Sequence, residues 1–265
     1  MKNPPSSPDS LLRLIQRELR RRNRALPGGV IWVFLEPVIT VSLLSIGFSW
    51  VLRSPPLGQS FALFFASGFG AFMVFQSLSG AVGHGFVFLK NKGRVWWPEA
   101  LLARVFVNGT FAISAAAAIG IGAATMSETP PFVDLYKITT ALGLSALLGI
   151  GIGVLNCALF SALPLWRPVW NVASRVVFLA SGVLFLPEHL PHNLQPLVAF
   201  NPLCHMLGLL RDGVYVSYSP RYGEVLFPML TGLLLGTLGL ALLVLTHPIP
   251  RAARRRTSRW LREKS

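Results

Sequence analysis

The sequence contains few charged residues and very few acidic ones. Charged residues make up 13% of its 265 residues, about half of the share that soluble domains usually carry, and Asp and Glu together number 10. Only two cysteines are present, Cys157 in a long apolar stretch and Cys204 in a short helical segment. This scarcity argues against a soluble domain, a disulfide framework and a zinc site built on cysteine.

Motifs of catalysis and of nucleotide binding are also missing. The chain has no GxxxxGK[ST] loop to hold a nucleotide, and no GxSxG, HExxH or CxxC motif. His189 and His192, spaced i and i+3 beside Glu188, lack a third and fourth ligand, so no metal is expected. Acid pairs of the kind found in proton-coupled carriers are absent from the apolar stretches, where Glu36 stands nearly alone. The energy for any transport must therefore come from elsewhere.

Long apolar runs are what the sequence has in abundance. Hydrophobic residues make up 52% of the chain and its mean hydropathy is +0.57. Uninterrupted runs of about 18 or more apolar residues predict an all-α, polytopic membrane protein, and their continuity is not the alternation of a β-barrel. We expect six membrane spans at about residues 30–52, 61–82, 105–125, 138–163, 169–187 and 225–246.

The segments outside this transmembrane domain (residues 30–246) are rich in Arg, Pro and Ser. Residues 1–10 are expected to be disordered and residues 247–265 to form a basic tail. Between residues 11 and 29 we expect an amphipathic helix at the membrane interface, with leucines toward the acyl chains. Its Arg face, directed to lipid phosphates, includes Arg17, Arg20, Arg21 and Arg24.

The net charge of +14 raises the question of a nucleic-acid partner. By the expected boundaries, however, 20 of the 24 Lys and Arg residues fall in the termini and in alternate loops on one side. That asymmetry is typical of the cytoplasmic side of membrane proteins. We therefore expect both termini in the cytoplasm and no nucleic-acid partner.

The stretch from residue 169 to residue 213 is the most informative part of the chain. An apolar span interrupted by Arg175 stops at Pro187 and is followed by a polar segment with His and Pro. A short helix should then begin with Asn201 as its cap and Pro202 in its first turn, and end at Gly213. An apolar span followed by a short amphipathic helix suggests the wall and lid of a pathway rather than a simple anchor.

Three features have two interpretations each. The basic loop 84–104, with Trp96 and Trp97, is either an ordinary cytoplasmic loop or a docking element for a partner. Arg175 either reaches the interface or pairs with Glu36, or else it lines a path for an anionic substrate. Small residues that recur every four positions either pack one bundle or form a dimer seam. They are Ala112, Ala116, Gly120 and Ala124, then Ser145, Gly149 and Gly153, then Gly232 and Gly236.

Short motifs spread over about residues 14–246 resemble one family. They are Arg17-Glu18-Leu19-Arg20, Pro27-Gly28-Gly29-Val30-Ile31-Trp32, Leu35-Glu36-Pro37, Ala103-Arg104, and Asn201-Pro202-Leu203 with His205 and Arg211. The chain resembles the ABC-2 type polysaccharide export permeases, in particular the KpsM-type capsule polysaccharide export permeases of Gram-negative bacteria. It departs from the pattern at Asn108, where an acidic residue is expected one turn after Arg104, which puts a buried pair of Arg104 in doubt.

The resemblance implies an ABC-2 (type V) exporter fold with a role for each segment. The residues concerned form a cytoplasmic entrance (Arg17, Arg20, Arg21, Arg24), an ATPase-coupling loop (Lys90, Asn91, Lys92, Gly93, Arg94, Trp96, Trp97, Pro98, Glu99), a channel (Trp32, Glu36, Arg175, Phe178) and a periplasmic gate (His189, His192, Asn201, Pro202, His205, Arg211).

The partners that the resemblance implies are a second copy of the chain, two copies of a cytoplasmic ABC ATPase that carries ATP and Mg²⁺, and periplasmic and outer-membrane export proteins. The chain would have no cofactor and no catalytic site of its own. It would lie in the bacterial inner membrane among lipids and export a lipid-linked, acidic capsular polysaccharide.

Other functions stay open from the sequence. The same architecture could export O-antigen, teichoic acid, another lipid-linked glycan, a drug or a lipid. A membrane-embedded transferase that uses His84, His189, His192 or His205 is a more distant alternative, as is a secondary transporter.

Overall fold

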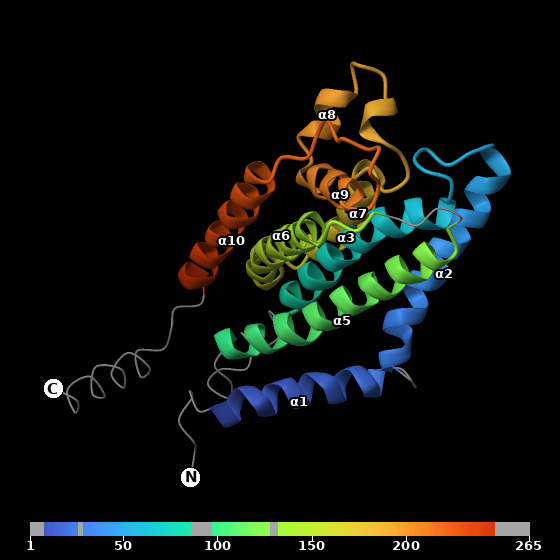
Figure 1. Cartoon of the computed structure of the whole chain (residues 1–265). Helices are drawn as coiled ribbons and strands as arrows, with labels where there is room; N and C mark the ends of the chain where they lie inside the picture. Colours follow the sequence, from blue (N-terminus) through green and yellow to red (C-terminus); the bar gives the residue numbers. More distant parts are fainter. Residues whose placement is uncertain (1–7, 26–28, 86–96, 128–131, 247–265) are drawn as a thin grey trace, which may run out of the picture.

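The computed structural model describes residues 8–25, 29–85, 97–127 and 132–246, and the described chain is helical with no β-strand. The long helices run side by side at a slant across the molecule (Figure 1). In chain order the elements are α1 (Pro8–Ala25), α2 (Gly29–Val51), α3 (Phe61–Gly83), α5 (Trp97–Thr125), α6 (Leu135–Ala162), α7 (Trp166–Ala180), the 3-10 helix η1 (Pro187–His189), α8 (Gln195–Ala199), α9 (Pro202–Asp212) and α10 (Leu226–Thr246). Residues 1–7, the basic tail 247–265 and residues 86–96 of the expected coupling loop lie outside the described residues.

Five helices in the described chain are long and apolar enough to cross a membrane. They comprise Gly29–Val51, Phe61–Gly83, Glu99–Thr125, Leu135–Ala162 and Leu226–Thr246. At 1.5 Å per residue, even 21 residues extend about 31 Å, the thickness of the hydrocarbon core. With 15 residues, α7 extends only about 22 Å, so the sixth span stays a prediction.

Two expected boundaries are wrong. The fifth apolar segment was expected to run from 169 to 187, but α7 begins at Trp166 and ends at Ala180. It ends there because Gly182 adopts a left-handed φ of 82° that a helix does not permit. The third span was expected to begin at residue 105, whereas α5 begins at Trp97 and includes part of the expected loop. Pro98 is tolerated in the first turn, where its missing N–H would have no intrahelical partner.

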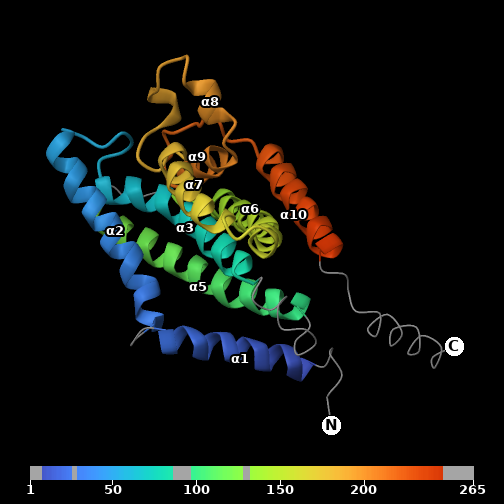
Figure 2. The ribbon, with the colours of Figure 1, turned by 180° about the vertical axis from the view of Figure 1, so that it is seen from behind.

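The core is organised around α3, whose side chains are buried on several faces. Phe64, Phe65, Val74 and Phe75 are each 0% exposed. One side of α3 packs against α6, with α10 beyond it, and another packs against α5. Helix α1 lies along α5 at the edge of the molecule opposite to α8 (Figures 1 and 2). The bundle thus has α1 at one end and the η1–α9 segment at the other.

Small residues let α6 approach both of its neighbours closely. A Cβ added to Gly149 would lie 2.7 Å from the carbonyl oxygen of Phe75 in α3. On the α10 side, a Cβ added to Gly232 would lie 3.2 Å from the Cα of Leu148. Packing within one bundle, the first interpretation of these residues, is therefore confirmed for α6 and α10. Gly120 of α5 differs, since a Cβ there would meet no atom within 4 Å in the described chain.

Candidate functional site

The amphipathic helix expected at residues 11–29 is α1, which ends at Ala25. Leu11, Leu14, Ile15 and Leu19 are half-buried on the side that meets the bundle. The arginines of the expected entrance, Arg17, Arg20 and Arg21, are exposed, and Arg24 lies in the last turn. The exposed arginines give this helix a cationic surface.

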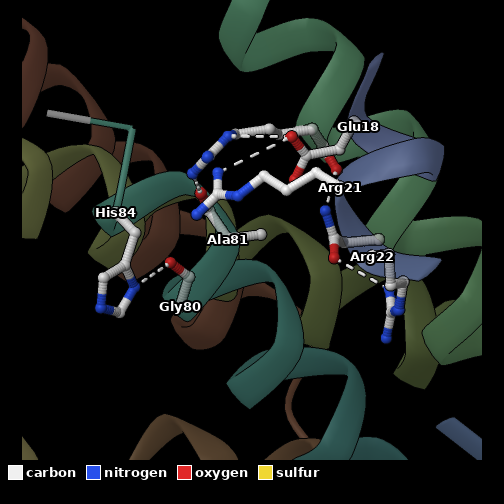
Figure 3. A network of polar contacts seen from close by, with 8 residues as sticks. Glu18, Arg21, Arg22, Gly80, Ala81 and His84 are labelled. Atoms are coloured by element: carbon white, nitrogen blue, oxygen red, sulfur yellow. Dashed lines mark hydrogen bonds and ion pairs between the residues drawn. The ribbon is translucent and has the colours of Figure 1, made fainter. Parts of the chain in front are cut away.

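An ion pair attaches α1 to α5. Arg104 is buried, and its Nε lies 3.6 Å from Oε2 of Glu18, whose side chain is 18% exposed. Arg104 Nη1 also donates a hydrogen bond of 2.8 Å to the carbonyl oxygen of Ala81. Ala81 lies in the last turn of α3, where carbonyls have no partner within their own helix. In Figure 3, Glu18 and Arg21 of α1 face this turn of α3.

Glu18 of α1 is thus an acidic partner of Arg104. Asn108, which stands where an acid was expected, holds a different contact. Its Oδ1 accepts a 3.0 Å hydrogen bond from Nη1 of Arg22, while its Nδ2 donates to the carbonyl oxygen of Arg104. The doubt that Asn108 raised about a buried pair of Arg104 is therefore resolved by Glu18.

Arg22 was not among the expected entrance residues, although its side chain turns inward to Asn108 of α5. Its guanidinium lies 4.9 Å from the ring centre of Phe111, and burial lowers its pKa while the charges of Glu18 and Glu36 act to raise it. The signal in the sequence was the four-residue spacing from Glu18, which places both side chains on one face of the helix.

A cavity of about 220 Å³ lies where α1, α2, α3 and α5 meet. Its polar lining consists of Arg22, Glu36, Gln76 and Ser77. The apolar part of the lining consists of Val33, Pro37, Phe69, Phe72, Met73 and Ala112. Glu36 therefore shares this cavity with Arg22 of α1.

The alternative pairing of Glu36 with Arg175 is not seen. Arg175 is exposed on α7, and neither side chain forms an ion pair within the described chain. The other expected channel residues differ in burial. Trp32 of α2 is 45% exposed, whereas Phe178 of α7 packs edge-on against Phe72 of α3, with 4.9 Å between ring centres. One side of Phe178 therefore packs against α3.

At the opposite end of the bundle, the first turn of α9 contacts the end of α7. Asn201 accepts a hydrogen bond from the backbone N–H of Leu203, as expected of a helix cap, and donates another to the carbonyl oxygen of Ala180. Pro202 begins the helix and Gly213 follows its end, both as expected. Cys204 lies against the carbonyl oxygens of Ala180 and Ser181. These contacts satisfy the backbone at the end of α7.

Arg211, expected in the periplasmic gate, is 1% exposed. Its guanidinium donates to the carbonyl oxygens of Val183, at 3.1 Å, and Phe185, at 3.3 Å, and lies 4.2 Å from the ring centre of Phe64. Burial lowers the pKa of Arg211 to about 10, so it remains charged at neutral pH. It therefore holds the turn between α7 and η1 against α3.

The histidines of the expected gate serve different purposes. Buried His205 uses both ring nitrogens, one near the carbonyl oxygen of Ala199 at 2.9 Å and one accepting from the N–H of Glu224 at 3.3 Å. His189 belongs to η1 and His192 to the turn that follows it. Glu188, which directly precedes His189 in η1, accepts hydrogen bonds from the hydroxyl of Tyr218 and the backbone N–H of Arg221.

Most of the expected coupling loop lies outside the described residues, namely Lys90, Asn91, Lys92, Gly93, Arg94 and Trp96. Its last three residues, Trp97, Pro98 and Glu99, form the first turn of α5. These three residues therefore belong to the same helix as Arg104.

Comparison with known proteins gives matches along most of the chain. The capsule polysaccharide export inner-membrane protein CtrC of Neisseria meningitidis is 23% identical over 232 residues, which cover 86% of this chain and 87% of CtrC. The capsule polysaccharide export inner-membrane protein BexB of Haemophilus influenzae is 20% identical over 237 residues, covering 86% and 88% of the two chains. The polysialic acid transport protein KpsM of Escherichia coli is 22% identical over 211 residues, covering 77% and 81%.

The sequence profile described as ABC-2 type transporter matches residues 9–215, from α1 to the residues just after α9. This range contains the Glu18–Arg104 pair, the cavity and the Arg211 contacts. Because the match covers well over half of the sequence, the chain belongs to the ABC-2 type transporter family.

Proposed function

We propose that the chain is the membrane-spanning permease subunit of an ATP-driven exporter of capsular polysaccharide in the bacterial inner membrane. The observation that carries this proposal is the similarity to CtrC, BexB and KpsM over most of both chains, within one transporter family. Five apolar helices of sufficient length support a multi-pass membrane protein.

In this proposal the energy comes from a separate ATPase chain that binds ATP and Mg²⁺. The absence of a GxxxxGK[ST] loop from the sequence supports that division. Two permease copies and two ATPase copies form the transporter, and residues 90–99 dock on the ATPase. Trp97, Pro98 and Glu99 belong to α5, which supports a path by which movement of the ATPase reaches the transmembrane helices.

The substrate in this proposal is acidic and lipid-linked. The exposed arginines of α1, namely Arg17, Arg20 and Arg21, receive its anionic lipid-linked end at the cytoplasmic face, where both termini lie. Arg175, exposed on α7, attracts the carboxylates or phosphates of the polymer. Periplasmic and outer-membrane proteins then take over the polymer.

The proposal is tested by purifying the permease together with the ABC ATPase encoded beside it and measuring ATP hydrolysis. Changing Lys90, Asn91, Lys92 and Gly93 together to alanine is expected to abolish association or coupling. The matched control is Arg53→Ala, which removes an exposed cation between α2 and α3 and should leave both unchanged. If no ATPase can be captured, the exporter function is wrong, and a membrane-embedded transferase replaces it.

A further inference from the structure

The cavity between α1, α2, α3 and α5 lies at a depth where polar side chains need partners. Glu36 is seven residues from the start of α2, and Gln76 is seven residues from the end of α3. At 1.5 Å per residue both lie about 10 Å along their helices from the same end of the bundle. In an apolar span this position is within or at the edge of the hydrocarbon core, where acyl chains offer no hydrogen bonds.

Several polar groups of the cavity have unused hydrogen-bonding capacity. In the described part of the chain, the carboxylate of Glu36, the carboxamide of Gln76 and the hydroxyl of Ser77 form no hydrogen bond or ion pair. Arg22 donates one described side-chain hydrogen bond, to Asn108. Glu36 and Gln76 are exposed, so the cavity is accessible from the side. These groups are therefore available to a polar ligand or to water.

The mixture of groups selects against ions of either sign. A simple anion would be attracted by Arg22 but repelled by Glu36, and a simple cation would meet the reverse. A neutral polyol suits both, because its hydroxyls can donate to the carboxylate and accept from the guanidinium and the carboxamide. The aromatic and apolar walls, which include Phe69, Phe72 and Met73, suit the C–H face of a sugar ring.

We propose that this cavity binds one polyhydroxylated ring or headgroup, with Glu36 accepting hydrogen bonds, Arg22 and Gln76 donating them, and the phenylalanines covering the apolar face. A volume of about 220 Å³ is enough for a single sugar ring and not for a chain of them. The polyol chemistry rests on the cavity, whereas a sugar of the exported glycan as the natural occupant rests on the proposed function. The other source of the same chemistry is the glycerol or inositol headgroup of a membrane lipid.

Native mass spectrometry of the full chain, released from phosphatidylcholine nanodiscs, measures the binding directly. The probes share an octyl tail and differ in the head: octyl glucoside is a neutral polyol, octyl sulfate an anion and octyltrimethylammonium a cation. One retained octyl glucoside per chain, in preference to both ions, is expected. Equal retention of the three probes, or preference for an ion, would overturn the proposal whatever the behaviour of any variant.

Two variants test the assignment of the groups. Glu36→Gln replaces a charged acceptor by a weaker neutral one, and Gln76→Leu removes a donor. Each change should weaken octyl glucoside retention about tenfold. Ser49→Ala, which removes an exposed hydroxyl near the other end of α2, should leave retention unchanged. Glu36→Gln preserves the shape of the side chain, so unchanged retention in that variant would contradict the assignment.

Competition then separates the two sources of the ligand. Displacement of octyl glucoside by methyl glucoside supports a glycan sugar, and displacement only by phosphatidylglycerol or phosphatidylinositol supports a lipid headgroup. Either result supports the polyol site. The assay contains no ATPase, so a failure of the site and a failure of the proposed exporter function are observed in different experiments.

Discussion

Replacing Arg211 by methionine removes a buried charge while filling most of its volume, and we expect this change to destabilise the protein. Arg211 makes two hydrogen bonds to the turn after α7, to the carbonyl oxygens of Val183 and Phe185. It also lies 4.2 Å from the ring centre of Phe64. Methionine can pack against the ring but cannot donate to the two carbonyls, which would stay buried without a partner.

The size of the effect follows from these contacts. Hydrogen bonds from a charged donor contribute about 1.5–3 kcal/mol each, and a desolvated cation–π contact about 2 kcal/mol. The desolvation of the guanidinium opposes these gains, and its Nε has no hydrogen-bond partner within the described chain. We therefore expect Arg211→Met to lower the free energy of unfolding by about 2–4 kcal/mol.

The measurement is thermal or denaturant unfolding of the purified chain in nanodiscs, with hydrogen exchange of residues 181–189 as a local readout. Arg175→Met is the matched control, because it makes the same substitution at an exposed position on α7 and should change stability by less than about 0.5 kcal/mol. Exchange of the turn should increase in the first variant alone. If the two variants were equally stable, the reasoning about Arg211 would be refuted.

Two further predictions concern helix packing. In a double-mutant cycle of Glu18→Gln and Arg104→Met, unfolding measurements should give a coupling energy of about 1–2 kcal/mol, because the pair is largely shielded from solvent. Additive effects of the two substitutions would show that this contact does not hold α1 in place. Gly149→Val should destabilise the protein by more than about 2 kcal/mol, because the added atoms meet the backbone of α3 at Phe75. The control Gly120→Val should have little effect on packing, because a Cβ at Gly120 meets no atom within 4 Å in the described chain. Similar unfolding curves for the two glycine variants would contradict this account of the α3–α6 contact.

The sequence was sufficient to predict the elements whose signals are local. Long apolar runs predicted six spans, and five of them correspond to described helices that are long and apolar enough to cross a membrane. A polar cap followed by proline predicted α9 at Asn201 and Pro202. It was insufficient at boundaries inside apolar stretches. The end of α7 depends on the backbone conformation of Gly182, and hydropathy does not distinguish residues of a turn from residues of a helix.

Contacts between distant segments were the other part that could not be predicted. The partner of Arg104 was sought one turn away along the chain, yet Glu18 is 86 residues distant and approaches only because α1 folds back along α5. The burial of Arg211 was missed for a similar reason. A cationic side chain near the end of an apolar segment usually reaches water. Nothing in the neighbouring sequence indicates that two backbone carbonyls of the preceding turn will accept hydrogen bonds from Arg211.

The contacts of Arg104 have a mechanical consequence for α5. From Trp97 to Arg104 the helix is a stiff rod of about 10 Å, with the proposed coupling segment at one end. Near its other end a single side chain is attached both to Glu18 of α1 and to the last turn of α3 at Ala81. A force applied at Trp97 is therefore transmitted through Arg104 to both α1 and α3. The interfacial helix and the central helix cannot be displaced independently while that side chain stays in place.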